Sequence, residues 1–410
     1  MSKPSVISLF TGAGGLDFGF EAAGFRTAVA LEMDAKCCVT LRTNRDWAVI
    51  EGDIANASTT EILKAGKLKA AEVDVLIGGP PCQPFSKSGF WATGEAKRLN
   101  DPRAATLDGY LRVLAEAKPR AFLLENVEGI GFKGKDEGLQ LIQSRLSSIN
   151  DKEGTNYRAS IAVVNAADYG VPQLRKRTIV VGSREGKDFV FPVPTHANRD
   201  EYAARGVRPY VSAWDALHDL PASIDPSVQL KGKWANLLSS IPEGQNYLWH
   251  TERGGGQALF GWRTRFWSFM LKLAKSEPSW TIQAQPGPAT GPFHWDNRRL
   301  TMREMARLQT FPDDVKIPGT LADAQRQLGN AVPSLLAEVL ATEISVQLLG
   351  RKRPNRDYQL SVRTATSSPP PPSETTPIPQ QYLHLLGDHE AHPGTGKGKG
   401  AQQRSIVAAE

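Results

Sequence analysis

The chain has 410 residues, of which 40% are hydrophobic and 22% charged, so composition and length predict a soluble globular protein of two or three folded units. The longest apolar runs fall far short of the roughly 18 residues of a membrane-spanning helix, and the N-terminal run is too short for a signal peptide, so we expect a cytoplasmic protein without a membrane partner. The net charge of +6 favours a polyanionic partner, and three cysteines, two of them adjacent, exclude a disulfide framework and a Cys-x-x-Cys zinc site.

Short β-branched runs alternate with helical stretches through the first 181 residues. This alternation is typical of an α/β fold with a mostly parallel sheet, in which ligands bind at the carboxyl ends of the strands. The residues that directly follow each run are therefore the candidate site. The seven predicted strands are Val6–Phe10, Ala28–Leu31, Ala48–Ile50, Val73–Ile77, Ala121–Leu124, Ile161–Val164 and Thr178–Val181.

A glycine-rich loop follows the first predicted strand. Gly12, Gly14 and Gly15 allow a tight turn and a close approach to a ligand, and Glu32 ends the second strand, where a carboxylate can bind ribose hydroxyls. Asp17 stands where a dinucleotide fingerprint needs a third glycine. A cofactor with ribose and adenine but no pyrophosphate fits better, and S-adenosylmethionine is the obvious candidate. Taken alone, the loop also fits an ordinary tight turn.

A thiol and a carboxylate follow two further predicted strands. Residues 78–86 read Gly-Gly-Pro-Pro-Cys-Gln-Pro-Phe-Ser, and the prolines hold Cys82 in a rigid loop, where a nucleophile would stand. Glu125 ends the fifth strand, so both groups reach the same edge of the sheet. The alternatives are a proline-rich turn with an incidental cysteine and a structural ion pair of the glutamate.

Two further segments carry polar residues toward the same edge. Asp53 and Ile54 follow the third strand and are placed to hold the edge and the face of an adenine ring. Alternation along an extended segment places Gln173, Arg175 and Arg177 on one face, although an isolated run of this kind also fits a solvated strand edge.

In chain order, these blocks resemble those of the DNA (cytosine-5)-methyltransferase family of bacterial restriction–modification systems. The resemblance covers about 4–182 and 297–345, and the ordered set of blocks is very specific. It implies a Rossmann-like, S-adenosylmethionine-dependent methyltransferase domain. The matching blocks are Phe10-x-Gly-x-Gly, Glu32, Gly52-Asp53, Gly79-Pro-Pro-Cys-Gln-Pro-Phe-Ser86, Glu125-Asn-Val127, Gln173-x-Arg-x-Arg177, Arg299-Leu-Thr-x-Arg-Glu-x-Ala-Arg-Leu-Gln-x-Phe-Pro312 and Gln327-Leu-Gly-Asn-Ala-Val-Pro333.

The resemblance also assigns roles to residues of this chain. Cys82 would attack C6 of a flipped-out cytosine, Glu125 would contact N3 and the exocyclic amine, and Arg175 would help hold the base. A nearby cation, Arg175 with Arg177 beside it, would favour the thiolate. We expect no metal. The implied cofactor-binding residues are Phe10, Thr11, Gly12, Gly14, Gly15, Glu32, Met33, Asp53, Ile54, Pro80, Asn330 and Val332.

Double-stranded DNA is the expected partner, and four segments are expected. Residues 1–188 would form the catalytic domain, 189–298 the target-recognition domain, 299–350 the return to the catalytic domain and 351–410 a disordered tail. Seven of the nine tryptophans lie in 189–298, where the strand–helix alternation disappears. A polar, glycine-punctuated loop at 83–103 would close over DNA. The expected DNA-binding residues are Ser86, Lys87, Gln173, Arg253, Arg263 and Arg265.

Three alternatives compete with this interpretation. A related enzyme would methylate cytosine in tRNA with the same residues, but the intervening segment 189–298 favours DNA. A non-catalytic DNA-binding regulator would not need Cys82 and Glu125 intact, and a nicotinamide oxidoreductase fits poorly with Asp17. We further expect a monomer, and a cognate restriction endonuclease that acts on the same site without forming a stable complex.

Overall fold

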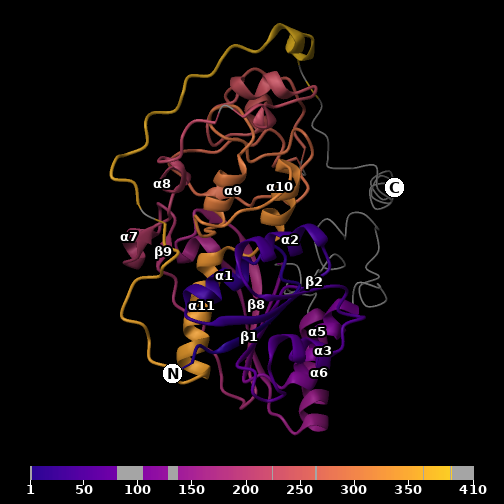
Figure 1. Cartoon of the computed structure of the whole chain (residues 1–410). Coiled ribbons are helices and arrows are strands. Elements are labelled where there is room, and N and C mark those ends of the chain that lie inside the picture. Colours follow the sequence, from indigo (N-terminus) through magenta and orange to yellow (C-terminus); the bar gives the residue numbers. More distant parts are fainter. Residues whose placement is uncertain are drawn as a thin grey trace, which may run out of the picture.

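The computed structural model describes residues 2–80, 105–127, 137–223, 225–263, 266–362, 364–387 and 389. These residues form two lobes, which Figure 1 shows one above the other. The sheet lobe (2–188 and 331–350) contains the central sheet with its covering helices. The second lobe (189–330) contains long irregular segments with short helices and two-residue strands.

The sheet lobe is built on a seven-stranded sheet in the order β3-β2-β1-β4-β5-β8-β6. β3, β2, β1, β4 and β5 pair in parallel, whereas β8 runs antiparallel to both β5 and β6. The predicted mostly parallel sheet is therefore confirmed, and each of the seven predicted runs contributes one strand. The strands are β1 Ser5–Leu9, β2 Arg26–Glu32, β3 Ala48–Glu51, β4 Val75–Gly78, β5 Ala121–Val127, β6 Arg158–Asn165 and β8 Lys176–Ser183.

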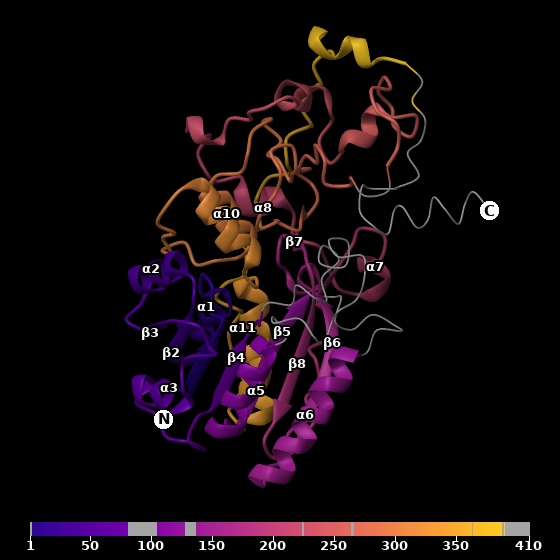
Figure 2. The ribbon, with the colours of Figure 1, turned by 90° about the vertical axis from the view of Figure 1, so that its right-hand side faces the viewer.

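Helices cover both faces of the sheet, and successive strand residues point alternately to the two helix layers. Val6, Ile77 and Leu123 face α1 and α11, whereas their neighbours Leu76 and Phe122 face the other layer of helices. Figure 2 shows α11 on one side of the sheet and α5 and α6 on the other. The helices of this lobe are α1 Gly15–Ala22, α2 Ala35–Asn44, α3 Thr59–Gly66, α5 Ala105–Ala117, α6 Glu137–Glu153, α11 Ser334–Glu343 with its π-helical continuation η7 Ile344–Leu348, and the 3-10 turn η3 Ala166–Tyr169.

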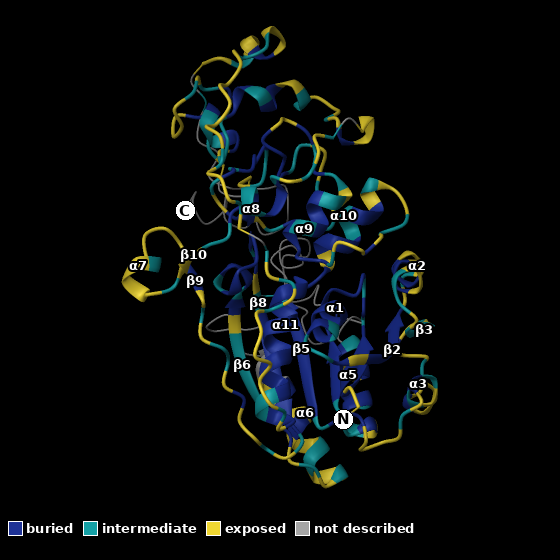
Figure 3. Cartoon of the chain, turned by 60° about the vertical axis from the view of Figure 1, so that its left-hand side comes forward, coloured by how far each residue is buried: buried dark blue, intermediate teal, exposed yellow. Residues whose placement is uncertain are grey.

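The second lobe has an aromatic core of its own. Trp234 contacts the rings of Phe260 and Phe269, and Tyr247 contacts the same two rings. Figure 3 shows this lobe as a mixture of buried and exposed segments, in contrast to the buried central strands β1, β4 and β5 of the sheet. Its elements are β9 His196–Ala197, α7 Tyr202–Arg205, β10 Arg208–Pro209, α8 Ala213–Leu217, η4 Pro226–Val228, η5 Ala235–Ser240, η6 Tyr247–His250, β11 Ser279–Trp280, α9 Met302–Leu308 and α10 Leu321–Asn330.

Contacts between the lobes are extensive around α9 and α10. Phe18 of α1 packs in one cluster with Leu308, Phe311 and Leu328, and β7 (Gln173–Leu174) of the sheet lobe pairs in parallel with β11 of the second lobe. The residues after 298 thus share a core with both lobes before α11 returns to the sheet. Among the described residues, the helical stretch Leu321–Leu348 is long and apolar enough to cross a membrane, but 89% of its apolar 18-residue window is buried within the protein.

The described part of the predicted tail makes contacts with the folded lobes. Up to residue 387 it contains one short 3-10 helix, η8 (Gln380–Leu385), and otherwise runs extended. Nevertheless, Gln359 and Leu360 donate backbone hydrogen bonds to Glu338, and Tyr382 is buried. Composition did not predict this order because it comes from isolated contacts with distant residues. Beyond 387 only His389 lies within the described residues.

Asp17 connects α1 to two strands from inside the protein. Its carboxylate is fully buried and accepts hydrogen bonds of 2.9 Å from the hydroxyls of Ser8 on β1 and Thr27 on β2. Loss of water contact raises the pKa of Asp17 to about 7, and the two hydroxyl bonds only partly oppose this effect.

The raised pKa of Asp17 predicts a pH-dependent stability. The native protein keeps a proton that the unfolded chain releases near pH 4, so this stabilisation is complete below pH 4 and disappears as pH rises through 7. From pH 5 to pH 8, the free energy of unfolding should fall by roughly 3 kcal/mol more in the wild type than in Asp17→Asn. Urea unfolding of both proteins at the two pH values measures this difference. Parallel pH profiles would contradict a neutral Asp17.

Candidate active site

The candidate site lies where the strand order reverses. The chain proceeds from β1 to β2 and β3 on one side and then returns to place β4 on the other side of β1. In open α/β sheets the carboxyl ends of two strands at such a reversal are the usual ligand position, and we call this place the crevice. Both predicted motifs, the glycine-rich loop and the segment leading to Cys82, begin at this crevice.

The glycine-rich loop after β1 has the strained backbone of a ligand-binding turn. Phe10, Gly12 and Gly14 have φ angles of 55°, 57° and 87°. Residues with a side chain rarely adopt positive φ angles, and glycine occupies two of these three positions. Apart from Gly12 and its two chain neighbours, no atom of the described residues lies within 4 Å of the point where a Cβ on Gly12 would stand, so this side of the loop is open to them.

Glu32 fixes this loop from the end of β2. One of its carboxylate oxygens accepts a 2.7 Å hydrogen bond from the Gly12 amide, and the other accepts a 2.8 Å bond from the Asp34 amide. Burial raises the pKa of Glu32, while the backbone amides of Asp34, Gly12 and Met33 oppose this shift. An ionised carboxylate offers about four lone-pair sites, so Glu32 can also accept a hydrogen bond from a ligand.

The turn between α10 and α11 closes the loop from the opposite side. A Cβ on Gly15 would collide with the carbonyl oxygen of Val332, so only glycine permits this approach. Val332 is 5% exposed, whereas Asn330, which ends α10, is exposed. The structure thus brings residues more than 300 positions apart in the sequence to the same crevice.

The other predicted cofactor residues differ in accessibility. Met33 is 66% exposed and Asp53 is also exposed, so both side chains are available to a ligand. Thr11 and Ile54 are buried: the Thr11 hydroxyl lies 3.1 Å from that of Ser8, and Ile54 packs against α5.

Glu125 stands at the start of the cysteine loop. Its carboxylate forms a 2.8 Å ion pair with Nε of Arg177, a diagonal neighbour on the antiparallel strand β8. The other carboxylate oxygen would lie 2.9 Å from a Cβ on Gly79, so this glycine leaves space for the acid. The amide of Asn126 donates a 3.3 Å hydrogen bond to the carbonyl of Pro80, which is buried. The sequence motif contained Gly79 and Asn126 but did not reveal these contacts.

Arg175 and Gln173 point away from Arg177 toward the second lobe. The buried Arg175 guanidinium donates hydrogen bonds of 3.3 Å to the carbonyl of Ile282 and 2.8 Å to that of Gly329, and its Nε has no partner among the described residues. Burial, together with Arg177, lowers the pKa of Arg175, and Glu125 opposes this shift. The single-face prediction therefore holds for Gln173 and Arg175, whereas Arg177 pairs with Glu125.

Gln173 does not occupy the DNA-facing position that we expected. It is fully buried; its amide donates to the carbonyl of Leu308, and its oxygen accepts from the amide of Ile282. This side chain connects the two lobes, so the structure argues against a direct DNA contact by Gln173. The alternation along 173–177 correctly predicted that Gln173 and Arg175 lie on one face of the segment. The sequence could not show that the second lobe covers that face.

Several predicted residues lie outside the described part of the chain. These are Cys82, Ser86, Lys87 and Arg265, together with the whole loop 83–103. The other two cysteines, Cys37 and Cys38 of α2, are buried as expected, and burial raises the pKa of both thiols. Neither has the low thiol pKa that characterises a nucleophilic cysteine.

The two described arginines among the predicted DNA-binding residues are exposed and lie beside aromatic rings. The Arg253 guanidinium lies 3.7 Å from the centre of the Trp262 ring, and that of Arg263 lies 5.5 Å from the Phe266 ring. Such contacts orient a guanidinium while leaving its N–H donors free.

Ion pairs between α2 and α10 were not predicted. Arg326 pairs with Asp34, and Lys36 pairs with Asp323 at 2.6 Å. Asp34 directly follows the exposed Met33, and α10 leads to Asn330, so these pairs hold both walls of the crevice together. The two residues of each pair are 292 and 287 positions apart in the sequence, so no local sequence pattern could predict these ion pairs.

Comparison with known proteins identifies the family. A family model for C-5 cytosine-specific DNA methylases matches residues 5–346. The chain therefore belongs to this family and is a DNA (cytosine-5-)-methyltransferase, which excludes a nicotinamide oxidoreductase and favours DNA over tRNA as the substrate.

Particular relatives agree with this assignment. The chain is 42% identical to the Type II methyltransferase M.SacI of Streptomyces achromogenes, and the match covers 84% of this chain and 93% of that relative. It is 44% identical to the Type II methyltransferase M.AquIA of Picosynechococcus, and that match covers 55% of this chain and 92% of the relative. The crystal structure of a putative DNA modification methyltransferase encoded within an E. coli prophage has a TM-score of 0.59 and 25% identity, with 85% of this chain and 100% of that chain covered.

Members of this family use S-adenosylmethionine as the methyl donor. The residues at the crevice fit this molecule. The acceptor oxygens of Glu32 suit ribose hydroxyls, the open side of Gly12 allows close approach, and the exposed Met33 offers an apolar surface to a ring.

Glu32→Gln should weaken cofactor binding. An amide places an N–H₂ group against one of the two backbone N–H donors, so we expect the dissociation constant of S-adenosylmethionine to rise about tenfold or more. Isothermal titration calorimetry measures this constant. Glu51→Gln is the matched control, since Glu51 is the register partner of Glu32 but forms an exposed ion pair with Arg42. Equal affinities of all three proteins would remove Glu32 from the binding site.

Proposed function

We propose that this protein transfers a methyl group to C5 of a flipped-out cytosine within a short duplex DNA sequence, through a covalent Cys82–C6 intermediate. One observation carries the proposal: the Glu125 carboxylate, held by Arg177, packs over Gly79, three residues before Cys82 and beside the crevice of the glycine-rich loop. An acid, a nucleophile and a cofactor site then meet at one edge of the sheet.

A nucleophile is needed because C5 of cytosine is too weakly nucleophilic to accept a methyl group unaided. Addition of the Cys82 thiolate to C6 moves electron density to C5 and gives an enamine. Bound S-adenosylmethionine supplies an electrophilic methyl group. Loss of the C5 proton and elimination of the thiol then restore the aromatic ring.

Glu125 would stabilise this addition by contacting N3 and the exocyclic amine. The ion pair with Arg177 leaves its second carboxylate oxygen, the one over Gly79, available to the base. Arg177 thus orients the carboxylate. Positioned acid–base groups contribute roughly 10²–10⁴ in rate.

The target carbon is inaccessible in stacked DNA, so the enzyme must rotate the nucleotide out of the duplex, at a cost of a few kcal/mol. We assign closure over the DNA to the loop 83–103, with Ser86 and Lys87, on its polar composition and its position after Cys82. Arg175 would contribute by holding the second lobe against the site through Ile282 and Gly329.

Sequence recognition is assigned to residues 189–298. The exposed Arg253 and Arg263, oriented by aromatic rings, offer the donors that read guanine edges or bind phosphates, and we assign Arg265 to the same surface from the sequence alone. We place the enzyme in the cytoplasm as a monomer. The Type II relatives support a restriction–modification system, whose endonuclease would act on the same site without a stable complex.

Expression in a methylation-free host followed by bisulfite sequencing tests the activity. Protected cytosines should occur in one short motif with the wild type and with Cys37→Ala, and disappear with Cys82→Ser. On DNA containing that motif, Glu125→Gln should reduce kcat about 10²- to 10⁴-fold.

No protection by soluble wild-type protein would contradict the DNA substrate and favour tRNA or a binding-only role. A Cys82→Ser variant that methylates normally would remove the covalent intermediate. Near-normal turnover of Glu125→Gln would remove Glu125 from the mechanism.

Arg263→Ala should relax sequence selectivity. An arginine that contacts a base contributes roughly 1–3 kcal/mol of discrimination, so the ratio of specific to non-specific affinity should fall about 5- to 150-fold. Competition binding with the identified motif and with a one-base variant measures this ratio. Arg205→Ala, which removes another exposed arginine of this lobe, is the control. Unchanged affinity and site preference in Arg263→Ala would refute the assignment.

A further inference from the structure

The chain after α11 connects both lobes, although its composition predicts disorder. We call residues 351–387 the strap. In Figure 1 it leaves the lower end of α11, runs along one side of the molecule and ends in a short helical turn on top of the second lobe. Three groups of contacts hold it.

The first anchor lies on the sheet lobe. Glu338 of α11 is 2% exposed, and its two carboxylate oxygens accept hydrogen bonds of 2.7 and 2.9 Å from the successive amides of Gln359 and Leu360. The side chain of Gln359 also donates to the carbonyl of Ala22 at the end of α1. Without the strap this buried carboxylate would lack both partners, which is unfavourable inside a protein.

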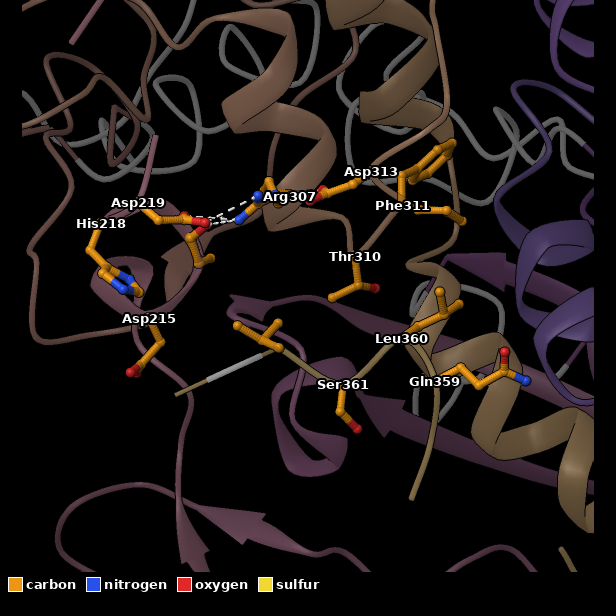
Figure 4. Close-up of a pocket in the computed structure, with 13 residues that line it drawn as sticks. Asp215, His218, Asp219, Arg307, Thr310, Phe311, Asp313, Gln359, Leu360 and Ser361 are labelled. Atoms are coloured by element: carbon orange, nitrogen blue, oxygen red, sulfur yellow. Dashed lines mark hydrogen bonds and ion pairs between the residues drawn. The ribbon is translucent and has the colours of Figure 1, made fainter. Parts of the chain in front are cut away.

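The second anchor lies at the junction of the lobes. The amide of Ala365 donates a 2.9 Å hydrogen bond to Asp215, and Trp214 of α8 donates a 3.3 Å bond to the carbonyl of Ser367. Here the strap forms one wall of a cavity of about 440 Å³. Figure 4 shows Leu360 and Ser361 on one side of this cavity and the hydrogen-bonded pair Asp219 and Arg307 on the other.

The third anchor completes the aromatic core of the second lobe. Tyr382 is 2% exposed, its ring stacks on Trp234 with a centroid distance of 5.7 Å and an interplanar angle of 19°, and its hydroxyl donates a 2.8 Å bond to the carbonyl of Lys233. Before it, Thr376 bonds to Ser239 through both its amide and its hydroxyl.

A continuous chain of contacts leads from Tyr382 to the proposed DNA-reading surface. Trp234 contacts Phe269, and Phe269 contacts Tyr247. The Tyr247 hydroxyl donates a 2.7 Å hydrogen bond to the carbonyl of Arg263 and accepts a 3.0 Å bond from its amide. Tyr382 therefore supports, through a packed core, the backbone that presents Arg263.

We propose that the strap holds the recognition segment in its DNA-binding position, with Tyr382 as the positioning residue, an inference that rests on the function proposed above for residues 189–298. Its anchors on α11 and on Trp234 restrain the second lobe relative to the sheet lobe. Among the described residues, the hydrogen bonds of the strap go to α11, to the end of α1 and to the second lobe, and none goes to the glycine-rich loop, so the two binding functions should separate.

Kinetics of full-length Tyr382→Ala test this role on DNA that contains the motif. We expect KM for DNA to rise about tenfold, with kcat within about twofold and cofactor affinity unchanged. Tyr382→Phe, which keeps the stacked ring, should stay close to the wild type, and so should Leu383→Ala, which alters an exposed residue of the same turn. A wild-type KM in Tyr382→Ala, or a parallel loss of kcat and cofactor affinity, would overturn the proposal.

Hydrogen exchange tests the strap without relying on methylation. In Tyr382→Ala the amides of 234–270 should exchange faster, while those of β1, β4 and β5 keep their wild-type rates. Unchanged exchange rates in 234–270 would overturn the proposed role of the strap, even if the enzyme is active. If the wild-type protein does not methylate DNA, but the amides of 234–270 still exchange faster in Tyr382→Ala than in the wild type, the result would support the strap and count against the proposed function.

Discussion

The turn that joins α10 to α11 is the constraint on which the site depends. Just before the turn, the Gly329 carbonyl at the end of α10 accepts a hydrogen bond from the buried Arg175, and within the turn the Val332 carbonyl lies against Gly15 of the glycine-rich loop. A Cβ on Gly329 would also collide with the backbone of Ala284 in the second lobe. The turn therefore touches both lobes and the cofactor crevice, and a shift there would disturb all three.

This arrangement explains why the two lobes act as one enzyme. The Asp34–Arg326 and Lys36–Asp323 pairs attach α10 to the helix that begins beside the cofactor crevice, and β7 pairs with β11 of the second lobe. The segments between them carry Arg175 and Ile282. On the proposed function, DNA recognition and methyl transfer share these connections, and the strap adds a third at the outer surface.

Much of the sheet lobe could be predicted from the sequence because its signals are local. Runs of β-branched residues marked all seven strands, and the parallel topology then brought Gly12, Glu32 and Glu125 to one edge. What failed depended on contacts between distant residues. Gln173 has the alternation of a surface residue, but the second lobe covers it. In the predicted tail, composition did not show that Tyr382 and Glu338 would hold the part up to residue 387.

The covalent role of Cys82 is the central claim, and trapping with a fluorinated base tests it most directly. In a duplex with 5-fluorocytosine at the target position, methyl transfer leaves fluorine at C5, which cannot depart as a proton, so the adduct cannot eliminate. Mass spectrometry of the digested complex should then find the DNA attached to the peptide that contains Cys82. Methylation of the normal duplex with no trapped adduct, or with an adduct at another residue, would contradict the account.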